Sequence, residues 1–463
     1  MKVKNSSVRP FGWRDKVGYM IGNVANDFTF IMASLYLQVF YTDVLGIKAG
    51  LVGTMFLLSR VVDAFTDTAM GRIADKTKAT KNGKFKPWLL RACGPVALAS
   101  FLMYQSGMAH ASMTVKVIYM FVTYLFWGSV CYTCINIPYG SMASVMSAEA
   151  DDRASLSTFR GVGSMIPQIL VGVVMPMFLY TKLADGTQVV NASAFPVVAL
   201  VLAVCAAACY VVCYFMCTER VKVEDKDVSI SFGDTVKALL SNRALIGIVI
   251  VYVGFLGAQM LNQTINNYIF KDYFNNTMGL SVLNAAGFAP ALLLAPIAVP
   301  LTSKFGKKEI GIAASIMGTV AFVLLFVMKT ANMWLYVIVN VLGSLGFGLF
   351  NLIIWAFVSD IIDDQEVKTH TREDGTIYAV CSFSRKIGQA IASALGGWSL
   401  SVIGYVEGAA VQSAAVASGI YTIATLVPAV LYLIVGLALA FVYDLNKKKV
   451  QQNTEILKSR KAQ

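Results

Sequence analysis

Charged residues are scarce in this chain of 463 residues: they make up 14% of it, against roughly 25% in soluble proteins. Hydrophobic residues make up 57%, and apolar runs of about 20 residues recur along the whole length, each long enough to cross a bilayer as a helix. This shortage of charge excludes an ordinary soluble protein and predicts a polytopic membrane protein.

The sequence also lacks the residue types and motifs of most enzymes and metal proteins. It has only two histidines, and its eight cysteines all lie in apolar segments, which favours packing over metal binding or disulfide formation. There is no phosphate-binding loop with a Walker lysine, no nucleophile elbow and no HExxH pair. We therefore expect neither enzymatic activity nor a cofactor.

The net charge of +12 does not indicate nucleic-acid binding, because the basic residues are concentrated in alternate loops. These loops lie near residues 2–16, 72–86, 304–308 and 447–449, whereas the connections near 109–114, 183–192 and 273–280 contain no Lys or Arg. By the positive-inside rule the basic loops face the cytoplasm, where anionic lipids attract them. We therefore expect the basic loops to interact with the lipid bilayer.

Twelve membrane spans are predicted from the apolar runs. They cover approximately residues 17–43, 47–71, 88–108, 115–143, 157–180, 193–216, 244–270, 281–302, 309–328, 332–359, 375–403 and 417–443. An even number of spans puts both termini on the cytoplasmic side, as the charge distribution requires. No cleavable signal peptide is expected, since the basic start leads into the first span without a cleavage-type flank.

The longest polar interruption divides the chain into two halves of six spans. We expect an N-terminal half at 1–217, a cytoplasmic central loop at 218–243, a C-terminal half at 244–443 and a cytoplasmic tail at 444–463. An all-α protein of this organisation resembles the major facilitator transporters, which are built of two six-helix halves.

The stretch RVVDAFTDTAMGR at residues 60–72 interrupts the second span with charge. At 100° per residue, Arg60, Asp63 and Asp67 lie on one face of a helix. Each charge at the centre of a membrane helix costs roughly 2.5–3.5 kcal/mol, and Asp27 adds a third carboxylate in the first span. One arginine cannot neutralise three carboxylates, so a mobile cation, a proton or a base from another helix must do so.

Two interpretations of the carboxylate pair remain open. Arg60 could lock Asp63 or Asp67 structurally, with nothing else bound. Alternatively, the pair could chelate Na⁺ with neighbouring oxygens such as that of Thr66, or share a proton because like charges raise one pKa. The excess of negative charge favours a cation site.

Basic residues interrupt two later spans. Arg160 begins the fifth, and Arg385 and Lys386 lie about ten residues into the eleventh. Long basic side chains can extend to an interface, but near mid-depth this is hardest. We therefore interpret Lys386 as a base that faces the cavity.

Several motifs resemble the glycoside–pentoside–hexuronide:cation symporters, the family of the melibiose permease. They are RVVDAFTDTAMGRIADKTKATKNGKFKPW from residue 60, YTDVLG at 41–46, NIPYGSMAS at 136–144, ERVKV after the sixth span and SDIIDDQEVKTHTREDGTIYAVCSFSRKIGQAI at 359–391. The likeness runs in order from about residue 12 to 440. It implies a secondary active symporter that takes up a sugar together with H⁺ or Na⁺ by alternating access.

The resemblance also implies roles for individual residues. Asp27 matches the sugar-binding acid of the family, and basic residues near the sugar and cation sites match Arg160 and Lys386. The cation-binding pair matches Asp63 and Asp67, with Thr66 and Thr133 at neighbouring positions. Asn26 and Asn136 complete the expected substrate site.

The departures from the family pattern concern the coupling ion and the substrate. Melibiose-type members have an aspartate at Asn136, a lysine at Asn26 and a tryptophan at Gly140. Losing the third carboxylate favours H⁺ over Na⁺, and the NIPYG form resembles the branch of glucuronide and sulfosugar transporters. Which sugar is carried, neutral or anionic, stays open.

Three other functions are less well supported by the sequence. A lysolipid-like substrate is disfavoured by Asp27, Asn26 and Asn136, which suit hydroxyl groups. An intramembrane aspartyl protease needs its aspartates on separate helices, and a channel needs a ring of pore charges. We expect a monomeric symporter in a bacterial cytoplasmic (inner) membrane.

Overall fold

The computed structural model describes residues 9–221, 242–287, 289–369 and 374–462, and this part of the chain is almost entirely helical. It divides into two compact units, Met1–Asp227 with Val406–Ala410 and Val228–Tyr405 with Val411–Gln463. The predicted central loop, 218–243, lies mostly outside the described residues.

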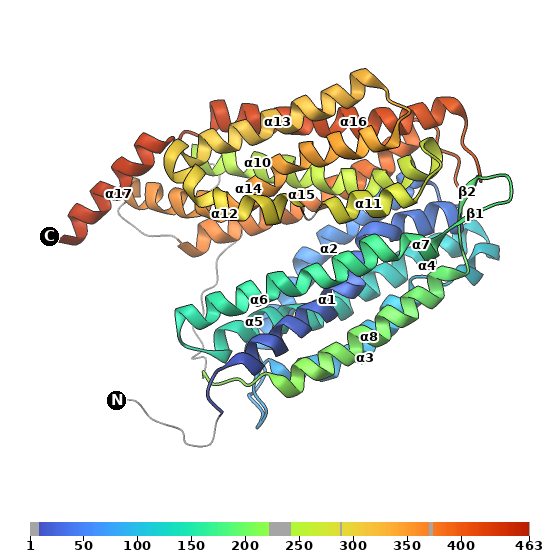
Figure 1. Cartoon of the computed structure of the whole chain (residues 1–463). Helices are drawn as coiled ribbons and strands as arrows, with labels where there is room; N and C mark the ends of the chain where they lie inside the picture. Colours follow the sequence, from blue (N-terminus) through green and yellow to red (C-terminus); the bar gives the residue numbers. More distant parts are fainter. Residues whose placement is uncertain (1–8, 222–241, 288, 370–373, 463) are drawn as a thin grey trace. The chain divides into compact units, whose positions relative to one another are not determined.

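The first unit contains the helices of the N-terminal half (Figure 1). They are α1 (Trp13–Val39) with η1 (Phe40–Val44), α2 (Ala49–Lys76), α3 (Lys86–Leu102), η2 (Ser106–His110), α4 (Met113–Leu125) with η3 (Phe126–Tyr132) and α5 (Thr133–Met146), α6 (Ala150–Ile169) with η4 (Leu170–Val174) and α7 (Pro176–Leu179), and α8 (Ala194–Met216). A short antiparallel hairpin, β1 (Tyr180–Lys182) and β2 (Gln188–Val190), stands in one connection.

The second unit contains the helices of the C-terminal half and the tail. They are α10 (Arg243–Tyr268) with η5 (Ile269–Tyr273), α11 (Met278–Ala286), α12 (Ala289–Phe305), α13 (Lys307–Met328), α14 (Met333–Thr369), α15 (Asp374–Val402), α16 (Ala414–Leu437) with η6 (Ala438–Val442), and α17 (Lys447–Ala462). Each of the twelve predicted spans falls on these helical segments, and the eighth, 281–302, covers parts of two of them, α11 and α12.

The two units repeat the same packing. In the first, α1 packs on α6 and α8, α3 packs on α5 and α8, and α2 packs on α5. In the second, α10 packs on α15 and α16, α13 packs on α14 and α16, and α12 packs on α14. The repeat that the sequence shows only weakly is therefore clear in the arrangement of the helices within each unit.

The repeat extends to a local distortion. The first helix of each unit ends in a π-helical turn, FYTDV at Phe40–Val44 and IFKDY at Ile269–Tyr273. The backbone N–H of Ile47 donates to the Tyr41 carbonyl at 2.9 Å, and that of Asn276 donates to the Phe270 carbonyl at 2.8 Å. Such turns cost helix regularity and are retained mostly where function needs them.

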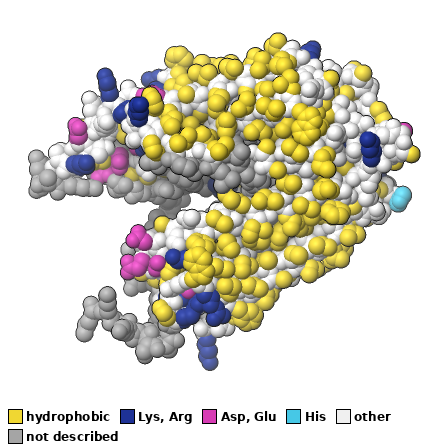
Figure 2. Space-filling view, in the orientation of Figure 1, with side chains coloured by type: hydrophobic (Ala, Val, Ile, Leu, Met, Phe, Trp, Pro, Cys, Tyr) yellow, Lys and Arg dark blue, Asp and Glu magenta, His cyan; other side chains and the backbone are white. Residues whose placement is uncertain are grey.

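The outward faces of the helices are hydrophobic (Figure 2). Phe65, Phe215 and Val327 are each at least 65% exposed, and they lie on helices of both units. Among the described residues, eight helices are long and apolar enough to cross a membrane by length and composition. Exposed apolar surface of this extent is stable only in contact with lipid.

Candidate functional site

Asn23 joins three polar side chains in the first unit. Its amide nitrogen donates to Asp27 Oδ2 at 2.8 Å and to Ser164 Oγ at 2.7 Å, and its amide oxygen accepts from Arg160 Nε at 3.0 Å. Asp27 and Asn23 come from successive turns of α1, whereas Arg160 and Ser164 come from successive turns of α6. The structure thus brings together Asp27 and Arg160, which the sequence assigned to the sugar.

Two tyrosines position the guanidinium of Arg160. Its central carbon lies 5.5 Å from the centroid of the Tyr139 ring, within cation–π range. The Tyr139 ring stacks on Tyr19 at 4.7 Å between centroids, and its hydroxyl donates to the Tyr19 carbonyl at 2.6 Å. Because both rings are buried, the cation is held over a rigid aromatic floor.

Asn26 is engaged entirely by the protein. Its amide nitrogen donates to the Tyr132 hydroxyl at 2.9 Å and to Asn136 Oδ1 at 3.0 Å, and its amide oxygen accepts from the Tyr210 hydroxyl at 3.1 Å. Three helical segments, η3, α5 and α8, are therefore tied to α1 through one buried amide. In this conformation Asn26 positions Asn136, and both N–H donors of its amide are used within the protein.

The contact between Asn26 and Asn136 explains two departures from the family pattern at once. Melibiose-type members have lysine and aspartate at these positions, and here two neutral amides face each other at 3.0 Å. Replacing a cation and an anion together leaves the net charge of the site unchanged. The missing carboxylate is thus matched by a missing lysine beside it.

Hydroxyl groups hold the two carboxylates of α2. Ser129 Oγ donates to Asp63 Oδ1 at 2.5 Å, and Thr133 Oγ1 is 2.9 Å from Asp67 Oδ1. Aspartates four residues apart face hydroxyls four residues apart, so the pairs form two rungs between α2 and the fourth membrane span. Asp63 and Asp67 therefore share a helix face, as their spacing predicts.

The two carboxylates differ in their surroundings. Asp63 is buried, and its second oxygen, Oδ2, forms an ion pair with Arg60 Nη1 at 3.2 Å. Both oxygens of Asp63 thus accept from the protein, one from a cation. Asp67 is only partly buried.

Ser129 is a residue of this site that the sequence analysis missed. It lies in the π-helical segment η3, where one extra residue per turn re-aims the side chains that follow. The expected neighbour Thr66 behaves differently, since its hydroxyl is 3.3 Å from the backbone carbonyl of Asp63 on its own helix. The serine is recognisable only once η3 is known to pack against α2.

Lys386 belongs to the second unit. It lies on α15 and is partly buried, whereas its neighbour Arg385 is exposed. The remaining sugar and cation candidates all belong to the first unit.

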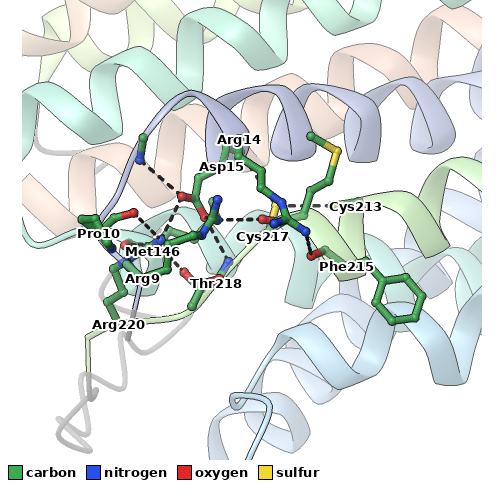
Figure 3. A network of polar contacts seen from close by, with 12 residues as sticks. Arg9, Pro10, Arg14, Asp15, Met146, Cys213, Phe215, Cys217, Thr218 and Arg220 are labelled. Atoms are coloured by element: carbon green, nitrogen blue, oxygen red, sulfur yellow. Dashed lines mark hydrogen bonds and ion pairs between the residues drawn. The ribbon is translucent and has the colours of Figure 1, made fainter. Parts of the chain in front are cut away.

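A second polar cluster surrounds Asp15 at the start of α1 (Figure 3). Asp15 is 0% exposed, yet it forms ion pairs of 2.8 Å with both Arg9 and Arg220. Its carboxylate also accepts from the backbone N–H of Thr218 at 3.1 Å and of Gly12 at 3.3 Å. The segment before α1 and the segment after α8 are joined at one buried anion.

Arg220 extends this cluster to the end of α5. Its guanidinium donates to the carbonyls of Arg9, Pro10, Met146 and Thr218 at 2.7–3.2 Å. The preceding residue, Glu219, accepts from three successive backbone N–H groups, those of Lys84, Phe85 and Lys86, at 2.5–2.9 Å. A carboxylate at the first turn of α3 opposes the positive end of the helix dipole. The ERVKV motif thus ties together four segments of one end of the unit.

Comparison with known proteins identifies the family. Residues 18–447 match the family described as MFS/sugar transport protein. The glucuronide carrier protein homolog of Escherichia coli strain K12 is 30% identical, covering 97% of this chain and 96% of that protein. The isoprimeverose transporter of Lactiplantibacillus pentosus is 30% identical, covering 95% and 93% respectively.

A solved structure supports the fold. The nucleoside transporter NupG superposes with a TM-score of 0.65 over 93% of this chain and 99% of its own, at 14% identity. This likeness shows the fold of two six-helix halves that major facilitator proteins share. The chain therefore belongs to the glycoside–pentoside–hexuronide:cation symporter family, a group of sugar transporters within the major facilitator superfamily.

Proposed function

We propose that the protein is a secondary active symporter that couples uptake of a glycoside, pentoside or hexuronide to H⁺, with Na⁺ as the alternative ion. The observation that carries this proposal is the pair of carboxylates on one face of α2, Asp63 and Asp67, each of which meets a hydroxyl of the fourth membrane span. A transporter that needed no coupling ion would have no use for two such costly groups.

The sugar site of the proposal consists of Asp27, Asn26, Asn136 and Arg160 in the first unit. Lys386, on α15 of the second unit, is a further candidate for sugar binding. A carboxylate accepts from vicinal hydroxyls and a guanidinium donates to ring oxygens or to a sugar carboxylate, in each case with two bonds at once. The names of the two relatives, a glucuronide carrier homolog and an isoprimeverose transporter, support sugars of both the acidic and neutral kinds. We further propose a monomer in the bacterial cytoplasmic membrane, with both termini in the cytoplasm.

Uptake by energised membrane vesicles tests the function directly. The panel is neutral glycosides, pentosides, hexuronides and sulfosugars, each with and without Na⁺. Accumulation of at least one sugar above its external concentration supports the symporter. Equilibration of every transported sugar, without accumulation under any ion gradient, contradicts it.

Substitution of Asp27 by Ala is expected to weaken sugar binding roughly 100-fold or more. Two charge-assisted hydrogen bonds, each about 1.5–3 kcal/mol, are lost with the carboxylate. Equilibrium binding to the purified protein measures the effect. Ser157→Ala is the matched control, because Ser157 is exposed on the same helix as Arg160, α6, and its hydroxyl donates to the Arg153 carbonyl. Unchanged affinity in Asp27→Ala would remove Asp27 from the sugar site.

The coupling ion is expected to be a proton. Na⁺ prefers several oxygens in a well-formed cage, whereas a proton needs one carboxylate, and only Asp63 and Asp67 are assigned to the cation. Sugar added to de-energised cells in a weakly buffered medium should raise the external pH, and a protonophore should stop accumulation. Absence of this alkalinisation, with uptake that scales with external Na⁺ at fixed pH, would assign Na⁺ instead, with Ser129, Thr133 and Thr66 as further oxygens.

A further inference from the structure

A groove of about 300 Å³ runs between α13 and α16 in the second unit. Its exposed walls are Ile316, Val320, Leu433 and Leu437, each 48–60% exposed. These side chains lie on the apolar outer surface and belong to neither the sugar site nor the carboxylate pair.

The lining of the groove is almost entirely apolar, and the hydrogens of its two aliphatic hydroxyls are already used within the protein. The hydroxyls of Ser315 and Thr319 donate to the carbonyls of Ile312 and Ser315 on their own helix, both at 2.8 Å. Gly436 leaves depth opposite Ser315, because a Cβ there would come within 2.7 Å of Ser315 Oγ. The groove therefore suits a hydrocarbon chain.

One end of the groove meets an ammonium group. Lys308 Nζ donates to the carbonyl of Ala440, a lining residue, at 3.2 Å and to that of Tyr443 at 2.6 Å. Lys447 Nζ donates to the Lys304 carbonyl at 2.8 Å, which joins the end of α12 to the start of α17. We call the segments 304–309 and 444–449 the basic rim.

The basic rim has an excess of positive charge. It contains six lysines against Glu309 and Asp444, and Asp360 neutralises one further charge by pairing with Lys307 at 2.6 Å. Lys304 and Lys448 are exposed. The rim lies on the side predicted to be cytoplasmic, where anionic headgroups are found and where basic pockets between membrane helices bind them.

The groove and the rim match one phospholipid. From Ile312 to Val320 the lining rises about 12 Å along α13, close to the roughly 15 Å of one hydrocarbon leaflet. We propose that the groove holds an acyl chain of an anionic phospholipid of the phosphatidylglycerol type, with its phosphate at the basic rim. A second copy of the chain would bring two basic rims together, which disfavours an interface at this place.

Native mass spectrometry of the purified full-length protein tests the proposal. Phosphatidylglycerol and phosphatidylcholine with identical acyl chains are added in equal amounts, and retained lipid is counted. The wild-type protein is expected to retain several-fold more phosphatidylglycerol. Equal retention of the two lipids would overturn the proposal.

Two sets of variants locate the bound lipid. Thr319→Phe fills the groove and should remove most of the preference, whereas Ala313→Phe adds the same bulk to an exposed position of α13 outside the lining and should not. The double variant Lys304→Gln/Lys448→Gln should reduce the preference, and the exposed pair Lys78→Gln/Lys81→Gln in the other unit should leave it unchanged.

Each result of these experiments either supports or contradicts the proposed lipid site. If Thr319→Phe fails to fold, the lysine variants still decide whether the charge at this rim selects the lipid. If both variant sets retain the full preference, the lipid binds elsewhere and the proposal is wrong. If Thr319→Phe instead turns a dimer into a monomer with lipid retention unchanged, the groove is an interface between copies and the proposal is equally wrong.

Discussion

Replacing Asp67 by Asn is expected to abolish accumulation of the sugar while leaving the protein folded. Asp67 is the carboxylate of α2 that is partly exposed, and the substitution removes its charge while keeping its size. For a neutral sugar carried with one cation, a potential of about 100 mV supplies about 2.3 kcal/mol, or roughly 50-fold accumulation. Without a cation site the sugar can only equilibrate, so its concentrations on the two sides of the membrane become equal.

Asp63→Asn should also abolish accumulation, but with a second effect. Its carboxylate neutralises Arg60 across 3.2 Å, so the substitution leaves a guanidinium without that partner in the membrane. We expect a lower midpoint of thermal unfolding for Asp63→Asn than for Asp67→Asn, measured on purified protein. The contrast distinguishes an anion that holds the site together from one that exchanges its cation.

Ser129→Ala and Thr133→Ala are the matched controls for the two rungs. Each removes one neutral hydroxyl and leaves both carboxylates, so accumulation should decrease without disappearing. Uptake at fixed gradients, together with exchange of labelled for unlabelled sugar at equilibrium, gives the measurement. Full accumulation by Asp67→Asn at normal gradients would contradict the assignment of the cation site.

The sequence could predict those features that depend on residues close together in the chain. Span length, loop charge and the helical spacing of Asp63 and Asp67 depend on residues within a few turns of one another. All twelve spans coincide with helices for this reason. The hydrophobic period does not report local distortions, so the π-helical turns within and at the ends of spans were not foreseen.

The partners of the charged residues could not be predicted, because they come from distant segments. Ser129 lies 66 residues from Asp63, and Tyr210 lies 184 residues from Asn26. Serine and tyrosine are ordinary in membrane helices, so neither residue type drew notice by itself. The neutral residue at Asn136 could be interpreted only from the structure, which shows that it contacts a second neutral amide, Asn26.

The cluster around Asp15 is the strongest case of this kind. Asp15 and Arg220 lie 205 residues apart and flank the first and sixth spans, where charges next to a membrane interface are commonplace. Nothing in the pattern distinguishes them from solvated loop residues. The structure buries Asp15 completely between two guanidiniums.

Asp15→Asn is therefore expected to destabilise the protein by about 3–5 kcal/mol. Removing one member of a buried ion pair leaves the other charge uncompensated, which costs far more than the pair contributes when intact. Arg220 also bonds four carbonyls from the segment before α1, the end of α5 and the segment after α8, so its displacement loosens all three.

A gradation of variants tests that explanation. Arg220→Gln should approach the effect of Asp15→Asn, because its side chain is 14% exposed, whereas Arg9→Gln should cost less, because its side chain is 33% exposed and water can replace it. Cys217 gives a local readout: it is buried, and its sulfur lies 3.8 Å from the Asp15 carbonyl. Its reaction with a thiol reagent should accelerate in the order Arg9→Gln, Arg220→Gln, Asp15→Asn. Equal unfolding midpoints and equal thiol reactivity for all three variants would mean that the buried carboxylate does not hold these segments together.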